Sequence, residues 1–292
     1  MKALFVHAHF DDYEFTAAGT FELLRRRLGG AFQAKVIVCT DGKAGHHVLT
    51  REETGRIRIA EQDASARLGG YQWELLRLPN GEVPREACLQ VTPDLLAALW
   101  KAIRDFEPDY LFCPPLPGEP LAGVHNDHLT VAEAIRRVAY MVNVPHAFTP
   151  EYSADEARSA PRRTPVILHV YDAYMSGANS FDLAVDVEEV FPLLCEMTWA
   201  HQSQVVEWLP WVGRHHMDPP KTPADWAKTL RARFSRKSRE LDLATPHAME
   251  VFTVSAWGEV PAHDELLADL PMISREFSNL ERVESRFSAW RG

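Results

Sequence analysis

An apolar run that passes directly into a polar tetrad lies near the start of the chain: residues 3–12 read ALFVHAHFDD. A second polar tetrad, HNDH at residues 125–128, follows one loop after the apolar run YLFC at residues 110–113. Short apolar runs bounded by polar residues are typical of strands buried inside a sheet. We therefore expect each tetrad to lie just beyond the end of a buried strand.

Strand-like and helix-like segments alternate through the first half of the chain. Strands are predicted at residues 4–7, 34–40, 73–78, 109–113 and 165–170, and helices at residues 15–28, 51–68, 93–106 and 129–142. This alternation predicts an α/β fold with a Rossmann-like, mainly parallel sheet flanked by helices. Ligands of such sheets bind beyond the carboxyl ends of the strands, where the strand order reverses. Both tetrads occupy that position, so side chains far apart in the sequence can meet in one crevice.

The second half of the chain is less regular. A strand is predicted at residues 181–187, helices at 193–208 and 223–241, and loops at 151–163 and 215–222. The last of these helices is rich in Lys and Arg, and we interpret its basic residues as a solvent-exposed face. No clear linker separates the two halves. We therefore expect a single domain over residues 1–292, with a Rossmann-like core (1–175) and a less regular C-terminal part (176–292).

Composition excludes several classes of protein. The chain has 292 residues, of which 46% are hydrophobic and 25% charged, as in ordinary globular proteins. Its formal net charge of -10 argues against a nucleic-acid partner. No run approaches the roughly 20 apolar residues of a membrane span, and no signal peptide is visible. The four cysteines are scattered without a CxxC motif, so we expect a soluble protein of a reducing, cytoplasmic compartment.

The tetrads supply candidate metal ligands. His9 and Asp12 are three residues apart at a strand–helix junction, where a tight turn can aim both side chains at one point. His128 is the natural third ligand. Imidazole nitrogen and carboxylate oxygen bind Zn²⁺ well, and three protein ligands with one open position are usual in catalytic zinc sites. Fe²⁺ and Co²⁺ suit the same ligands.

Three further side chains of the tetrads remain for acid–base chemistry. Asp11 is expected to act as the general base that removes a proton from water. His125, when protonated, is expected to stabilise an oxyanion or to protonate a leaving amine. Asp127 is expected to orient the His125 imidazole and keep it charged. Either tetrad alone would be weak evidence, because 13 histidines in the chain produce such spacings by chance; together they indicate a metal hydrolase.

A series of segments resembles, in order, the signature motifs of the LmbE-like (PIG-L) N-deacetylases. The segments are AHFDDYEFTAAGT at 8–20 (family AHPDD…E…GGT), TDGKAG at 40–45, the RxxE helix from Arg58, LPNG at 78–81 (family LPDG), HNDH at 125–128 (family HPDH), AHQSQ at 200–204 and MEVF at 249–252. The likeness extends from about residue 3 to 255. It implies a Rossmann-like fold and Zn²⁺-dependent hydrolysis of the N-acetyl group of N-acetylglucosamine conjugates or related amides.

The resemblance also implies roles for individual residues. By position it makes His9, Asp12 and His128 the metal ligands and Asp11 the general base. His125 becomes the oxyanion stabiliser or general acid.

Within the same resemblance, Asp127 supports His125, and Arg58 and Asn80 face the sugar or aglycone. Asn80 departs from the family because an Asp is usual at this position. Phe10 and Asn126 replace the prolines of the two family tetrads, and neither change removes a ligand. The departures affect the expected substrate more than the metal chemistry.

The expected function is removal of the N-acetyl group from a small-molecule conjugate of the N-acetylglucosamine type. One alternative is hydrolysis of a larger amide, as by a thiol-conjugate amidase or a tailoring deacetylase of a natural product. Another is a non-catalytic α/β module that binds a sugar or metabolite. The complete set of catalytic groups disfavours the second alternative.

Six other histidines are interpreted without a catalytic role. His7 is expected to be buried at the end of a strand or behind the ligands. His46 and His47 lie in a loop that borders the crevice, where they could touch substrate. His201 is expected to serve packing or capping, and the pair at 215–216 could line the mouth of the cavity.

Overall fold

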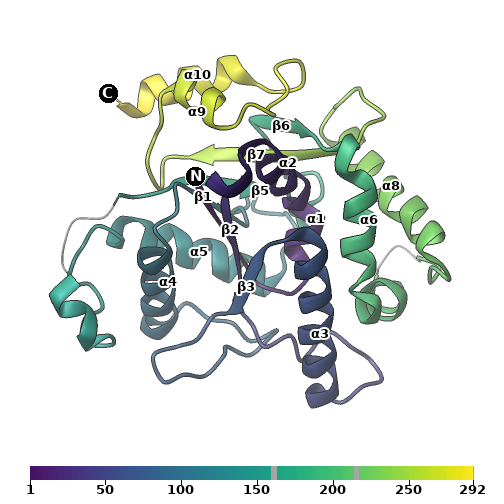
Figure 1. Ribbon diagram of the computed structural model, residues 1–292, viewed down its shortest axis with the longest axis horizontal. Helices are drawn as coiled ribbons and strands as arrows, with labels where there is room; N and C mark the ends of the chain where they lie inside the picture. Colours follow the sequence, from purple (N-terminus) through teal and green to yellow (C-terminus); the bar gives the residue numbers. More distant parts are fainter. Residues whose placement is uncertain (159–162, 214–216, 292) are drawn as a thin grey trace.

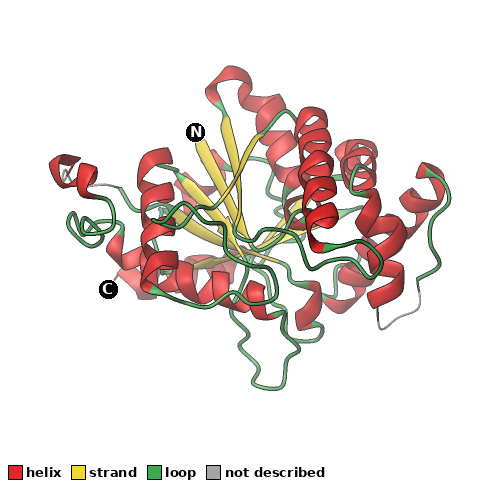
Figure 2. Ribbon diagram, turned by 90° about the horizontal axis from the view of Figure 1, so that it is seen from below, coloured by secondary structure: helices red, strands yellow, loops and turns green. Residues whose placement is uncertain are grey.

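The computed structural model describes residues 1–158, 163–213 and 217–291. A seven-stranded sheet in the order β3-β2-β1-β4-β5-β7-β6 crosses the molecule, with helices on both faces (Figures 1 and 2). The strands are β1 (Lys2–His7), β2 (Gln33–Val38), β3 (Gln72–Leu75), β4 (Tyr110–Cys113), β5 (Val166–Val170), β6 (Leu183–Asp186) and β7 (Met249–Ser255). Strands β1 to β5 pair in parallel, and β7 runs antiparallel to both β5 and β6. The predicted α/β fold with a mainly parallel sheet is confirmed.

The helices follow the strands along the chain. The α-helices of the described residues are α1 (Asp12–Thr16), α2 (Ala18–Leu28), α3 (Arg51–Gly69), α4 (Pro93–Phe106), α5 (Asn126–Met141), α6 (Phe191–Trp199), α7 (Leu209–Val212), α8 (Pro223–Glu240), α9 (His263–Asp269) and α10 (Leu280–Arg291). Short 3₁₀ segments are η1 (Gly29–Ala31), η2 (Ser153–Arg158), η3 (Ala173–Met175) and η4 (Glu188–Val190), and a π-helical segment, η5, spans Ser203–Trp208. None of the helices in these described ranges is long and apolar enough to cross a bilayer.

The sheet separates two hydrophobic cores. Strand β1 contributes Ala3 and Phe5 to one core and Leu4 and Val6 to the other, because successive side chains of a strand point to opposite faces. Helices α4 and α5 cover the second core, whereas α2, α6 and α8 cover the first. A strand with both faces covered in this way reads as a continuous apolar run, which is why the sequence signal was strong.

Helix α4 begins where its sequence predicts. The Thr92 hydroxyl oxygen accepts a hydrogen bond from the backbone amide of Leu95 at 3.2 Å, and Pro93 occupies the first turn. A threonine cap followed by proline satisfies the free amides of a helix start without losing a needed donor. The predicted helix at residues 93–106 is confirmed.

The predicted helix at residues 15–28 is wrong in its start and in its continuity. It begins at Asp12 and is broken at Ala17, whose backbone (φ -143°, ψ -7°) is not helical. The break creates a second helix N-terminus, where the backbone amides of Gly19 and Thr20 donate to the buried Glu250 carboxylate at 2.8 and 2.7 Å. A long-range contact therefore decides this local feature.

The second tetrad lies inside a helix rather than before it. Helix α5 begins at Asn126, three residues earlier than the predicted start at Leu129, and His125 is its N-cap. The His125 Nδ1 atom accepts a hydrogen bond from the Asp127 backbone amide at 3.2 Å. Ser, Thr, Asp and Asn are the usual N-caps, so a histidine cap was not recognised.

The C-terminal part of the chain completes the sheet. Strand β7 was not predicted, yet it joins β5 and β6, and the predicted helix at 193–208 instead ends at Trp199 before the π-helical segment η5. Two further helices, α9 and α10, follow the sheet. Because residues 176–292 share one sheet with residues 1–175, we keep the proposal of a single domain.

Two predicted loops lie partly outside the described residues. Positions 159–162 of the first and the pair 215–216 of the second belong to the parts that the structure does not describe. The basic helix is α8, and its interpretation as a wholly solvent-exposed face is wrong. Lys237 is only 5% exposed, because it lies on the inner, mostly apolar face of the helix with Trp226, Leu230 and Phe234.

Candidate metal centre

The two tetrads meet at the carboxyl edge of the parallel strands. His9 Nδ1 lies 3.1 Å from His128 Nε2 and 3.4 Å from Asp12 Oδ2. The distance from His128 Nε2 to the other carboxylate oxygen of Asp12 is 3.5 Å. Three side chains, from the turn after β1, the start of α1 and the start of α5, thus present donor atoms to one point.

This spacing fits a divalent metal. Zinc bonds of 2.0–2.2 Å in a tetrahedron place neighbouring ligand atoms roughly 3.3–3.5 Å apart, which is close to the three distances. Two overlapping groups of donors fall within 4.8 Å, and both contain His128: one adds His9 and His125, the other His7 and Asp12. His7 and His125 are therefore the nearest further nitrogen donors.

The charge of the surroundings favours a cation at this point. Burial lowers the pKa of His9, but hydrogen bonds with Asp12 and Asp127 outweigh burial and raise the pKa to about 10. Burial likewise lowers the pKa of His128, and Asp12 and Asp172 raise it to about 9. Carboxylates that stabilise an imidazolium here will equally stabilise a bound metal cation.

Each imidazole of the pair is held from behind by a carboxylate. Asp127 Oδ2 lies 3.2 Å from His9 Nε2, and Asp172 Oδ2 lies 3.0 Å from His128 Nδ1. Such partners fix the tautomer and orientation of metal-binding histidines. The predicted contact of Asp127 with the His125 imidazole is wrong, since the carboxylate faces His9 and the amides of residues 87 and 89.

Sequence reasoning missed Asp172. One residue separates Asp172 from the end of β5, just as one residue separates the first tetrad from the end of β1. Asp172 is 4% exposed. The same rule, a polar residue just beyond a buried strand, would have found it. Tyr174 of the same turn was also missed, and its ring centroid lies 5.1 Å from that of His125.

Asp12 is fixed in place by two donors. His7 Nδ1 lies 2.5 Å from Asp12 Oδ2, and the His9 backbone amide donates to the same oxygen at 2.8 Å. Burial acts to raise the pKa of Asp12, but His7 and His128 hold it well below its usual range. His7 is therefore buried behind the metal ligands, as its position at the strand end suggested.

Asp11 occupies a strained position between the ligands. Its φ of 79° and ψ of -20° lie in the left-handed region, which Asp tolerates better than most residues and which recurs at functional sites. Arg58 Nη2 lies 3.2 Å from Asp11 Oδ1, and Arg58 Nη1 lies 3.7 Å from Glu61. Burial raises the pKa of Asp11, although Arg58 and His201 oppose this.

His125 lies in the same pocket in a neutral form. Burial and the positive charges of His9 and His128 lower the pKa of His125 to about 4. The lowered pKa favours the neutral imidazole, and the predicted acid–base role of His125 stays a prediction. A neutral imidazole can still donate one hydrogen bond to an oxyanion.

A small pocket of about 110 Å³ contains these side chains. Its lining also includes Glu86, Gln204, Trp208 and Arg233, none of which was predicted as a site residue. Arg58 lines the pocket, as predicted. The pocket is large enough for a small acyl group but not for a whole conjugate, for which pockets of roughly 300–1,000 Å³ are usual.

Asn80 does not line this pocket. It lies in the turn that follows β3, where its side-chain amide donates to the Glu82 carboxylate at 3.0 Å and its carbonyl accepts the Glu82 amide at 2.9 Å. Its predicted contact with substrate stays a prediction.

Three other histidines that the sequence singled out do not line this pocket. His46 Nε2 is 3.0 Å from the Glu207 carboxylate, and His47 stacks on Trp211 with ring centroids 4.8 Å apart. His201 is fully buried, and its Nε2 atom lies 3.3 Å from Glu14. The burial of His201 agrees with a packing role, and contact of His46 or His47 with substrate stays a prediction.

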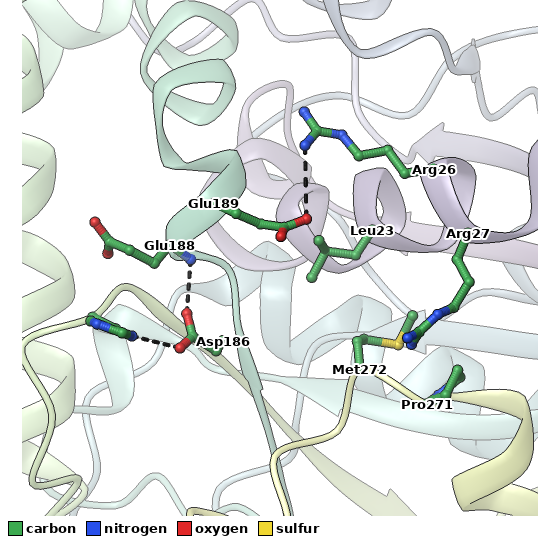
Figure 3. A pocket seen from close by; sticks show the side chains of 9 residues that line it. Leu23, Arg26, Arg27, Asp186, Glu188, Glu189, Pro271 and Met272 are labelled. Atoms are coloured by element: carbon green, nitrogen blue, oxygen red, sulfur yellow. Dashed lines mark hydrogen bonds and ion pairs between the residues drawn. The ribbon is translucent and has the colours of Figure 1, made fainter.

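A larger cavity of about 700 Å³ lies away from the metal centre, between α2, η4 and the segment around Met272 (Figure 3). Two pairs of its charged side chains contact one another: Arg26 lies 3.8 Å from Glu189, and His247 lies 2.6 Å from Asp186. We assign the chemistry to the smaller pocket, because the candidate metal ligands and Asp11 lie there.

Comparison with known proteins identifies a family domain in the chain. Residues 4–139 match the family model PIG-L, described as GlcNAc-PI de-N-acetylase. The chain therefore carries a PIG-L (LmbE-like) domain, and the resemblance stated from the sequence is confirmed. No curated protein sequence matches the chain.

Solved structures share the fold at low identity. The N,N'-diacetylchitobiose deacetylase of Pyrococcus horikoshii is 21% identical, with a TM-score of 0.66 over 88% of this chain and 84% of the other. The 4-carboxy-2-hydroxymuconate hydratase of Pseudomonas putida is 14% identical, with a TM-score of 0.59 over 87% and 95%. A deacetylase of teicoplanin biosynthesis is 13% identical, with a TM-score of 0.54 over 88% and 99%. Because a hydratase shares the fold, the reaction must be argued from the site.

Proposed function

We propose that this protein is a metal-dependent amidohydrolase that removes the acetyl group from an amino-sugar conjugate of the N-acetylglucosamine type. The observation that carries the proposal is the placement of Asp11. Its carboxylate lies beside three converging metal donors, is held by Arg58, and has a pKa raised by burial. A carboxylate with a raised pKa is suited to take a proton and to give it back.

The metal would be held by His9, Asp12 and His128. When bound, a divalent ion, with Zn²⁺ the first candidate, supplies a Lewis acid for the acyl oxygen and acidifies water. Asp127 and Asp172 hold the two imidazoles so that their nitrogens face the ion. The description of the matching family model supports deacetylation, and the donor set supports zinc.

The protein's own groups would carry the proton transfers. Asp11 takes a proton from the attacking water while the oxygen of that water adds to the acyl carbon. His125 donates a hydrogen bond to the acyl oxygen while negative charge develops there. The proton on Asp11 then passes to the amide nitrogen, the carbon–nitrogen bond breaks, and acetate and a free amine leave.

The test measures acetate release from a panel of N-acetylglucosamine conjugates, with and without a chelator, together with the metal content of the purified protein. Asp11→Asn should retain the metal and lose about 10²–10⁴-fold in kcat, since it removes the general base. Asp264→Asn, at an exposed site on α9, is the control and should keep full activity. A metal-free protein, or an active Asp11→Asn variant, would refute the proposal.

Product analysis separates this function from its alternatives. Release of an acyl group larger than acetate would indicate a thiol-conjugate amidase or a tailoring deacetylase. Stoichiometric metal without turnover on the panel would favour a binding module.

A further inference from the structure

A second group of cationic side chains lies beside the metal pocket. Helix α8 turns Arg233, Arg236 and Lys237 toward a side pocket of about 50 Å³. Arg233 lines both this side pocket and the metal pocket, and so do Phe15 and Tyr171. The two pockets are therefore adjacent and share a wall.

Two charges of this side pocket have no partner among the described residues. In the three described ranges, neither Arg233 nor Lys237 makes a side-chain hydrogen bond or an ion pair. Arg233 instead lies over the Phe15 ring, 4.6 Å from its centroid, and Lys237 lies 4.2 Å from the centroid of Phe234. Lys237 is 95% buried, being only 5% exposed. Burying a charged side chain without a partner costs free energy, and an anion bound in the side pocket would reduce that cost.

The nearby acids are already occupied. Asp11 acts on Arg233 through space, but its carboxylate is paired with Arg58 at 3.2 Å. Glu250 acts on Lys237 only through space, because both of its oxygens accept hydrogen bonds from Gly19 and Thr20. Glu240 accepts the Tyr171 hydroxyl at 2.7 Å. Burial also lowers the pKa of Lys237, to about 8, and it remains largely charged at neutral pH.

We propose that Arg233 and Lys237 form an anion subsite of the metal pocket, so that the preferred substrate carries a carboxylate or phosphate group besides its acyl amide. The acyl amide in this substrate rests on the proposed function, whereas the binding of an anion does not. A guanidinium binds either oxyanion with two parallel hydrogen bonds, and the ammonium adds a point charge. The stacked Phe15 ring holds the guanidinium plane in place.

Calorimetry on the zinc-loaded protein tests the subsite without turnover. The probes are glucosamine, glucosamine 6-phosphate, glucosamine 1-phosphate and muramic acid, which separate neutral, phosphate and carboxylate ligands. At least one anionic sugar should bind tenfold or more tightly than glucosamine. Arg233→Gln should remove this preference and leave the Kd of glucosamine within about threefold.

Two further variants control for stability and general charge. Lys237→Met should reduce the anion preference without abolishing glucosamine binding. Arg239→Gln removes one charge from an exposed position of the same helix and should change neither Kd.

Three results would overturn the subsite: no anionic sugar binds more tightly than glucosamine, the preference survives Arg233→Gln, or Arg233→Gln weakens glucosamine equally. Acetate release from the N-acetylated forms is measured in parallel. Anion preference without acetate release would refute the proposed reaction alone, and acetate release without anion preference would refute the subsite alone.

Discussion

At the scale of single residues, the candidate metal centre depends on the carboxylates behind its histidines. Asp127 and Asp172 come from different elements and meet opposite sides of the histidine pair. Each gives an imidazole one fixed orientation, and each adds negative charge beside the point where a cation would bind. Ligand geometry is thus set by residues that need not touch the metal.

Asp172→Asn should therefore weaken the metal site rather than remove it. We expect a loss of about 10–100-fold in zinc affinity, as is typical when such outer partners are removed. Competition with a chromophoric chelator measures this affinity. The exposed substitution Asp264→Asn should leave it unchanged, and an unchanged affinity in Asp172→Asn would show that the 3.0 Å contact with His128 is not needed.

At the scale of elements, the inner face of helix α8 carries both residues that stabilise the fold and a residue of the proposed anion subsite. Its buried Trp226, Leu230 and Phe234 pack into the core, while Lys237 places a charge on the same inner stripe. The apolar residues hold the helix on the molecule, and the charged residue opposes them. The residue proposed to bind an anion therefore lowers the stability that its apolar neighbours on the same face provide.

Lys237→Met should stabilise the protein at neutral pH. The pKa of Lys237 is about 8 in the folded protein and near 10.5 in the unfolded chain. Below pH 8 the amine is charged in both states and the cost of burial is fully present. Between pH 8 and 10.5 the unfolded state binds more protons, so the cost declines as pH rises.

Urea denaturation of the two proteins at several pH values measures this difference. The variant should exceed the wild type by about 1–3 kcal/mol at pH 7, and the gap should close toward pH 10.5. Arg239→Gln should show no such gap. A gap that stays constant across this pH range would contradict the buried charge.

At the scale of the whole molecule, the C-terminal part is tied to the N-terminal part at the buried Glu250 of β7. Its carboxylate accepts the free amides of Gly19 and Thr20 at the start of α2. A Cβ atom on Gly19 would lie 2.7 Å from the Val187 side chain, so only glycine allows this approach. The pocket itself takes Asp172 and Arg233 from outside residues 4–139, so the matched segment does not hold the complete site.

Glu250→Ala should lower the free energy of unfolding of the whole protein, and its effect should not be confined to helix α2. Removing a buried acceptor leaves the two amides and the Thr20 hydroxyl unpaired, which we expect to cost about 2–4 kcal/mol. Thermal or urea unfolding followed by circular dichroism measures the loss. Glu281→Ala, on the exposed start of α10, is the matched control, and equal stability of the two variants would contradict the proposed tie.

Local patterns in the sequence determined where the first strands and helices follow one another along the chain, and which two tetrads carry the candidate site residues. Strands β1 and β4 are short buried runs. His9 and Asp12 follow β1 closely, and His128 lies at the start of α5, one loop after β4, so these positions were readable without any distant contact. Helix α4 was equally clear, since Thr92 and Pro93 are a cap and a first turn.

Only the tertiary structure decided which distant groups face the site. The break at Ala17 depends on Glu250, the partner of His9 proved to be Asp127, and the inward turn of Lys237 depends on how α8 packs. Each of these depends on contacts between residues far apart in the chain. Sequence periodicity reports the local conformation and the apolar face of an element, but the pairing of polar side chains is set by the packing of whole elements against one another.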